Sequence, residues 1–166
     1  LILVRHGAVS YSGRVGGAGD GLNTLGELQP QALARRLSER NIAAIYTSPL
    51  RRAAHTAEIL AQFLGAPVRE DARLLEFDAG ESRETIRKRA LAAADEIVFS
   101  HTGQEAVAVS HSDTISTLIG HFLGLEIRDG WPFALDHCGL SVLEFEGSSA
   151  VVRTLNDTAH LEGLAL

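Results

Sequence analysis

The sequence predicts an α/β fold in which helices cover both faces of a mostly parallel central sheet, giving a three-layer α/β/α sandwich. Short, fully apolar runs typical of buried strands alternate with longer segments whose apolar residues have helical spacing. Two of the apolar runs end in histidine-containing triplets, and ligands in such folds bind at the carboxyl ends of the strands. A length of 166 residues suits a single domain over residues 1–166.

The chain is expected to begin with a strand, a loop and a helix. Residues 1–4 (LILV) are wholly apolar, as in a central strand buried on both faces. Residues 8–25 are rich in Gly and Ser and lack periodicity, which indicates a loop. Residues 26–40 have helical spacing, and Pro30 is then expected in the first turn, where proline is tolerated.

A second strand and helix follow. Residues 43–47 form the strand. Ser48 and Pro49 are typical of an N-cap and a first helical position, so a helix is expected to start there and to end at Gly65. Residues 67–69 read as another extended piece.

The second half of the chain continues the alternation and ends in a hairpin. Its last two expected strands are separated by EGSS, a turn-forming sequence. The elements expected here are a helix over 82–99, a strand over 105–110, a helix over 113–123, and strands over 140–145 and 150–155.

Composition excludes several classes of function. A net charge of −6 argues against a general nucleic-acid binder, which needs a broad positive surface. No apolar run approaches the roughly 20 residues of a membrane span, and the start lacks the features of a signal peptide. The one cysteine, Cys138, cannot form an internal disulfide, and no Cys/His cluster has zinc spacing. We therefore expect a cytoplasmic protein with no membrane partner, no metal and no cofactor.

The triplet Arg5-His6-Gly7 is the first candidate for chemistry. A lone histidine at the end of a strand is more often packed than functional. Here, however, an arginine suited to an anion precedes it, and a glycine that allows close backbone approach follows. A second histidine, His111, ends another apolar strand in the same way.

A third group of residues points to the same chemistry. Arg51 and Arg52 lie near the start of the second expected helix, where the helix dipole disfavours cations and favours anions. At least one of these arginines is therefore expected to face an anionic partner.

Together these residues resemble the phosphoglycerate mutase-like histidine phosphatase superfamily. The similarity spans nearly the whole chain, with its blocks in the family's order. The matching segments are Val4-Arg5-His6-Gly7, residues 13–29, residues 45–57 (IYTSPLRRAAHTA), Leu75-Glu76 with Gly80, residues 107–125 (VAVSHSDTISTLIGHFLGL) and residues 156–161 (NDTAHL).

The resemblance implies a role for each matching residue. His6 would attack phosphorus and become phosphohistidine. Arg5 and Arg52 would bind the phosphoryl oxygens, with His111 as a further donor. Glu76 would protonate the leaving oxygen and then take a proton from water, which requires a raised pKa. No metal is implied, because the arginines and histidines supply the positive field.

Some positions depart from the family pattern. Many members carry a helical insertion after the glycine at Gly80, whereas this sequence runs directly into Glu81-Ser82. Either the protein is a short form with an open pocket, or the insertion is missing from the sequence as printed. Glu81 is therefore a rival to Glu76 as the general acid. Arg14, in the Gly-rich loop, is either a further phosphate ligand or an ordinary surface residue. His137 and His160 match no catalytic position, and packing or solvent exposure is expected for both.

The leading hypothesis is a metal-independent phosphatase that hydrolyses a small phosphorylated metabolite. A phosphomutase would return the phosphoryl group to a second hydroxyl instead of to water. A phosphoprotein phosphatase of the short type is disfavoured by the presence of Glu76. A non-catalytic module that only binds a phosphorylated ligand is the alternative from another class, and the intact set of arginines and histidines argues against it.

Overall fold

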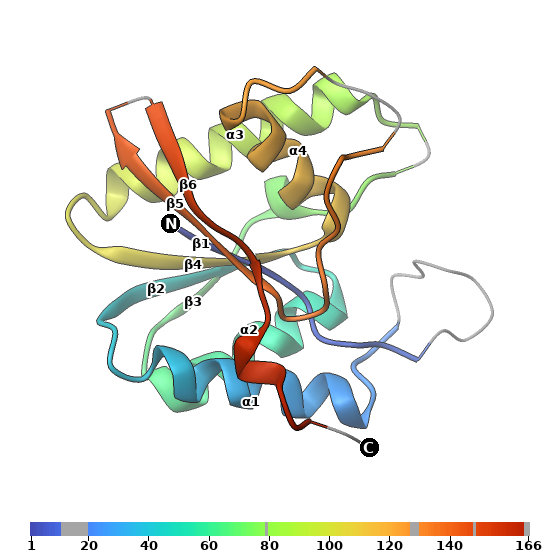
Figure 1. The fold of residues 1–166 in the computed structure, drawn as a ribbon, viewed down its shortest axis with the longest axis vertical. Coiled ribbons are helices and arrows are strands. Elements are labelled where there is room, and N and C mark those ends of the chain that lie inside the picture. The colour runs from blue at the N-terminus through green and yellow to red at the C-terminus, as the bar shows by residue number, and fades with distance from the viewer. Residues whose placement is uncertain (11–19, 79, 127–129, 148, 165–166) are drawn as a thin grey trace.

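A central sheet lies between two layers of helices (Figure 1). The computed structural model describes residues 1–10, 20–78, 80–126, 130–147 and 149–164. Within these residues the sheet has six strands in the order β3-β2-β4-β1-β5-β6. Helices α1 and α2 cover one face, and α3 and α4 cover the other. The predicted three-layer α/β/α sandwich is confirmed.

The sheet is mostly parallel, as predicted. Strand β1 pairs in parallel with β4, and β2 pairs in parallel with both β3 and β4, whereas β5 runs antiparallel to β1 and β6. Arg5 lies beside Ser110 in the register, so the next residues, His6 and His111, leave the sheet side by side at one edge. The strands are β1 (Ile2–Arg5), β2 (Ile42–Thr47), β3 (Val68–Glu70), β4 (Glu105–Ser110), β5 (Leu140–Glu146) and β6 (Ser149–Asp157).

The core has one hydrophobic cluster on each side of the sheet. Successive side chains of a strand point to opposite faces, and β1 shows this directly. Ile2 and Val4 pack in the cluster beneath α1 and α2, whereas Leu3 packs in the cluster beneath α3 and α4. The helices are α1 (Thr24–Leu37), α2 (Arg51–Leu64), α3 (Arg83–Ser100) and α4 (Ser112–Phe122), with short 3-10 turns at Ala72–Leu74 and Ala159–Leu161.

The predicted position of Pro30 in the first turn of a helix over 26–40 is wrong. Helix α1 begins at Thr24, because the side chain of Asn23 caps it by accepting from the Gly26 N–H at 2.8 Å. Pro30 therefore lies inside the helix, beyond its first turn. Since proline has no N–H, it leaves the Gly26 carbonyl without the usual helical donor. That carbonyl instead lies close against Gly7.

The predicted N-cap at Ser48 is also wrong. Helix α2 begins two residues later than predicted, with Leu50 at the N-cap position and no side-chain cap. The Ser48 hydroxyl accepts from the Leu50 N–H at 3.3 Å and lies 2.8 Å from Nε2 of His111. Ser48 thus contributes to the site at the strand ends and not to the start of the helix.

The remaining predicted elements are confirmed, with ends displaced by no more than a few residues. Within the predicted loop 8–25, residues 11–19, which include Arg14, lie outside the described residues, and Val9 and Leu22 form an isolated antiparallel bridge. No helix in the described part of the chain combines the length and the apolar character needed to cross a membrane.

Candidate active site

His6 follows β1 directly and is held rigidly in the interior. Its side chain is 4% exposed, and its backbone N–H donates to the Ser110 carbonyl at 3.0 Å. Gly7 after it donates its N–H to Oγ1 of Thr56 at 3.0 Å. A Cβ on Gly7 would lie 2.3 Å from the Gly26 carbonyl oxygen, so the close approach of α1 requires glycine at this position.

The hydrogen bonds of His6 determine which ring nitrogen carries the proton. Nδ1 lies 2.8 Å from the Gly7 carbonyl, which can only accept, so Nδ1 carries the proton. Nε2 is then unprotonated, and its lone pair accepts from Nε of Arg52 at 3.2 Å. Burial lowers the pKa of His6 to about 3, against the raising effect of the Gly7 carbonyl and with help from Arg52. The ring is therefore neutral near pH 7, with Nε2 ready to act as a nucleophile.

Two arginines bring positive charge to His6. Arg52, in the first turn of α2, is 4% exposed, and Thr56 donates its hydroxyl to the Arg52 carbonyl at 2.7 Å. Arg5 donates from Nη1 to the Leu135 carbonyl at 2.5 Å. Its buried Nε has no hydrogen-bond partner among the described residues. Such a pair of guanidinium groups is suited to the oxygens of a phosphoryl group.

His111 follows β4 and lies against His6, with ring centroids 5.2 Å apart. It is fully buried, and its Nε2 lies 2.8 Å from the Ser48 hydroxyl. Its Nδ1 has no hydrogen-bond partner in the described part of the chain and lies 3.8 Å from Oε2 of Glu76. Burial, assisted by neighbouring positive groups, lowers the pKa of His111 to about 2, so this contact with Glu76 is not an ion pair in the free protein.

Glu76 is the carboxyl group that the fold brings to this cluster. Its Oε1 accepts from the Phe77 N–H at 3.1 Å, and its side chain is 25% exposed. Burial raises the pKa of Glu76; the Phe77 N–H opposes that rise, and the Asp113 carboxylate adds to it. A raised pKa is the property that a general acid near neutral pH needs.

Glu81, the rival acid, is instead paired with an arginine. Its two carboxylate oxygens accept from Nε and Nη2 of Arg89 at 2.7 and 2.9 Å, and this hydrogen bonding lowers the pKa of Glu81. Arg89 also donates to the carbonyls of Leu75 at 2.7 Å and Glu76 at 3.3 Å. The Glu81–Arg89 pair thus supports the backbone that carries Glu76, and this arrangement favours Glu76 as the acid.

His137, for which sequence reasoning expected packing or solvent exposure, lies in this cluster. Its ring centroid is 5.3 Å from that of His6. Burial and the nearby Arg5 lower the pKa of His137 to about 4. The sequence places His137 just before a predicted strand, but only the antiparallel pairing of that strand with β1, seen in the structure, brings His137 to the end of β1.

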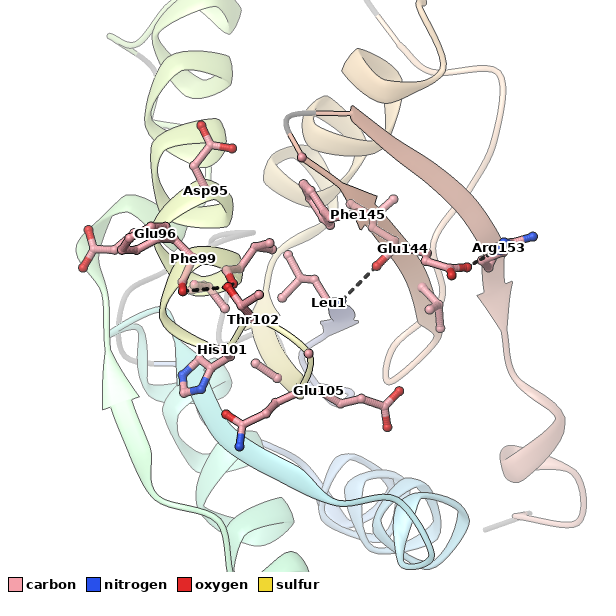
Figure 2. A pocket seen from close by; sticks show the side chains of 18 of the residues that line it. Leu1, Asp95, Glu96, Phe99, His101, Thr102, Glu105, Glu144, Phe145 and Arg153 are labelled. Atoms are coloured by element: carbon pink, nitrogen blue, oxygen red, sulfur yellow. Dashed lines mark hydrogen bonds and ion pairs between the residues drawn. The ribbon is translucent and has the colours of Figure 1, made fainter.

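Other features of the molecule lie apart from this cluster. A cavity of about 1180 Å³ opens at the opposite edge of the sheet, where β1 and β4 begin (Figure 2). There the Leu1 ammonium donates to the Leu143 carbonyl at 2.9 Å, and Glu144 pairs with Arg153. Among the described residues, no group of three or more His, Cys, Asp or Glu side chains is arranged to hold a metal ion. Cys138 is buried, and burial raises the pKa of its thiol.

Comparison with known proteins finds one family over most of the chain. The model of the Histidine phosphatase superfamily (branch 1) matches residues 1–84 and 76–158. The two matched segments overlap at residues 76–84, which include the junction of Gly80 with Glu81-Ser82.

Individual relatives match along their full length. Phosphoserine phosphatase 1 of Hydrogenobacter thermophilus is 28% identical over 97% of this chain and 93% of the relative. A protein named Probable phosphoglycerate mutase GpmB, from Yersinia enterocolitica, is 28% identical over 100% of this chain and 96% of the relative. The structure of Bacillus stearothermophilus YhfR superposes with a TM-score of 0.91 at 25% identity, covering 97% of this chain and 98% of that one.

Proposed function

Because the chain belongs to the histidine phosphatase superfamily (branch 1), we propose that it is a phosphatase that hydrolyses a small phosphomonoester through a phosphohistidine at His6. The observation that carries the proposal is the state of His6. Its Nδ1–H donates to the Gly7 carbonyl, and its unprotonated Nε2 accepts from the Arg52 guanidinium. A neutral nucleophile beside a cation is what attack on a phosphate ester requires.

In the first step, Nε2 of His6 attacks phosphorus and the bond to the leaving oxygen breaks. Arg5, Arg52 and His111 bind the non-bridging oxygens and stabilise their charge in the transition state. Glu76, whose raised pKa favours the protonated form, gives its proton to the leaving oxygen. The alcohol departs, and the phosphoryl group remains on His6.

In the second step, water attacks the phosphoryl group and the phosphorus–nitrogen bond breaks. Glu76, now a carboxylate, takes a proton from that water, and His6 regains its neutral form. The Nδ1–H of His6 donates to the Gly7 carbonyl throughout, so the imidazole returns to the same tautomer. Inorganic phosphate is released, and the carboxyl group is protonated again.

The substrate class is a small phosphorylated metabolite. Relatives at 28% identity carry names that refer to phosphoserine and phosphoglycerate, so phosphomonoesters of short carboxylic acids are the first compounds to test. After Glu76 the sequence runs from Gly80 directly into Glu81-Ser82, where many members of the family carry a helical insertion. A shorter covering over Glu76 favours access of water and thus hydrolysis over mutase chemistry, which must retain the phosphoryl group. A silent binding module would have no use for a nucleophile with a fixed tautomer.

The test is hydrolysis of p-nitrophenyl phosphate in the presence of a chelator, with His6→Ala as the inactive variant. His121→Ala is the matched control, since His121 lies exposed at the end of α4. We expect the control to match the wild type and His6→Ala to lose activity by several orders of magnitude. Rapid quenching with labelled phosphoserine should leave an acid-labile phosphoryl group on the wild type alone. Equal inertness of wild type and His6→Ala on a panel of phosphomonoesters would overturn the proposal, and label on a second hydroxyl would indicate a mutase.

A further inference from the structure

The nucleophile lies between two imidazole rings, only one of which has a place in the mechanism above. The ring of His111 is 5.2 Å from that of His6, and the ring of His137 is 5.3 Å away. His111 follows β4, whereas His137 lies in the segment that leads into β5. The two rings thus approach His6 from different elements.

The backbone beside His137 is hydrogen-bonded directly to the end of β1, where Arg5 and His6 lie. The Cys138 N–H donates to the Arg5 carbonyl at 2.9 Å and to the His6 carbonyl at 3.3 Å. Cys138 has a φ of 55°, an uncommon conformation for a residue with a side chain. Its carbonyl accepts from Nε2 of His160 at 3.0 Å. These contacts fix the position of His137 relative to Arg5 and His6.

The residue before His137 is held as firmly as the residue after it. The Asp136 N–H donates to Oδ1 of Asn156 at 2.8 Å, and Nδ2 of Asn156 donates to the Asp136 carboxylate at 2.8 Å. Asn156 itself has a φ of 49°, which asparagine tolerates better than most residues. His137 is therefore presented by a braced segment that has fixed contacts on both sides.

Despite this bracing, the ring of His137 has an unused polar atom. Its Nε2 is buried and has no hydrogen-bond partner in the described part of the chain. The same is true of Nε of Arg5 and Nδ1 of His111, which also lie around His6. Leaving a buried polar group unpaired costs about 1–3 kcal/mol. Three such nitrogens around one nucleophile indicate a ligand with several acceptor oxygens, which a phosphoryl group provides.

We infer that His137 is a further phosphoryl-binding residue, whose neutral imidazole donates its Nε2–H to a non-bridging oxygen of the group that His6 attacks. This inference rests on the proposed function. It assigns His137 to the phosphoryl group, which all substrates share, and not to the organic part of any one substrate. Loss of the His137 imidazole therefore weakens binding of every phosphomonoester by the same factor.

The test compares His137→Phe, which keeps a ring but has no donor, with His137→Asn, which keeps a donor. Binding of orthovanadate and inorganic phosphate is measured by calorimetry, so that the readout does not depend on turnover. We expect His137→Phe to bind both anions about 10- to 100-fold more weakly than the wild type, as for loss of a hydrogen bond to a charged group. We expect His137→Asn to stay within a few-fold of the wild type, and His121→Phe, at an exposed site, to match it.

Kinetics and spectroscopy complete the test. The loss of kcat/KM in His137→Phe should be the same for p-nitrophenyl phosphate and phosphoserine, and the imidazole nitrogen resonances of His137 in the wild type should shift when vanadate is added. The inference would be overturned by unchanged anion affinity in His137→Phe, by a loss of kcat/KM confined to one ester, or by resonances of His137 that do not shift with vanadate. The resonances are measured on the wild type, so this part of the test remains even if His137→Phe does not fold. A wild type that binds vanadate through His137 but turns over no ester would refute the proposed phosphatase while sparing this contact.

Discussion

Mild acidification is expected to destabilise this protein at a pH where carboxylates with lowered pKa values, such as Glu81 and Asp157, are still ionised. Burial lowers the pKa of His6 to about 3 and that of His111 to about 2, whereas both are close to 6.5 in the unfolded chain. As pH falls below 6.5, these histidines bind protons in the unfolded state but remain neutral in the folded state. The free energy of unfolding therefore decreases on acidification.

The decrease in the free energy of unfolding between pH 7.5 and 5.5 does not depend on how far below 5.5 the pKa values of these histidines lie in the folded state. At pH 5.5 each histidine is about one pH unit below its unfolded pKa and still neutral in the fold, which costs about 1.4 kcal/mol per residue. His137, whose pKa is lowered to about 4, contributes in the same way, so the three residues together lower the free energy of unfolding by about 4 kcal/mol relative to pH 7.5. The raised pKa of Glu76 acts in the opposite direction in this range and moderates the decrease. Asp157, whose partner Arg36 lowers its pKa to about 2, loses its contribution only in more acidic solution.

Urea denaturation at pH 7.5 and 5.5 measures this difference. With a slope of roughly 2 kcal/mol per molar urea, the midpoint should fall by about 1 to 2 M. His6→Asn removes one of the three titrating groups, so its midpoint should fall by about two thirds as much. His121→Asn, at an exposed site, should fall as the wild type does. Equal midpoints of the wild type at the two pH values would refute the claim that both histidines are buried in neutral form.

Two further substitutions test other parts of the site. Glu76→Gln should lower kcat/KM for phosphoserine by about 10²–10⁴-fold and for p-nitrophenyl phosphate by much less, because a nitrophenolate leaves without protonation. Glu81→Gln should lower the melting temperature and reduce kcat/KM for phosphoserine less than Glu76→Gln does. A larger loss of kcat/KM in Glu81→Gln than in Glu76→Gln would exchange the roles of the two residues. Gly7→Ala should destabilise the fold by about 3 kcal/mol in thermal unfolding, since its Cβ would lie 2.3 Å from the Gly26 carbonyl. Gly80→Ala, where no described atom lies within 4 Å of the new Cβ, is its control, and equal melting temperatures would contradict the argument.

The sequence was sufficient to predict the layers of the fold and the meeting of His6 and His111. Both histidines follow fully apolar runs, and parallel strands place their carboxyl ends at one edge, so the register of Arg5 beside Ser110 confirmed an expectation based on pattern alone. Elements whose apolar spacing is strong, such as α2 and β4, were placed within a few residues.

What the sequence could not predict depends on contacts between distant segments. Ser48 has the character of an N-cap, but the buried His111 provides a competing partner for its hydroxyl. Asn23 lies in a Gly-rich stretch where no periodicity marks a helix start. The preference for Glu76 over Glu81 as the proposed general acid depends on Arg89 of α3, which donates to the Glu81 carboxylate and to the Glu76 carbonyl. Predicting that His137 lies beside His6 required the pairing of β5 with β1, because only the antiparallel direction of β5 brings His137 to the end of β1.

One physical cause, the removal of water from the strand ends, prepares both halves of the chemistry. Burial disfavours the charged form of any group, and it therefore lowers the pKa of His6 and raises that of Glu76. In the proposed mechanism, the first shift supplies a lone pair for attack, and the second supplies a proton for the leaving oxygen. A single environment thus meets the opposite needs of the two groups. The negative charge of a bound phosphoryl group opposes the effect of burial on the pKa of His111 and adds to the rise in the pKa of Glu76. In that mechanism the substrate itself therefore strengthens the donors that bind it and the acid that releases its alcohol.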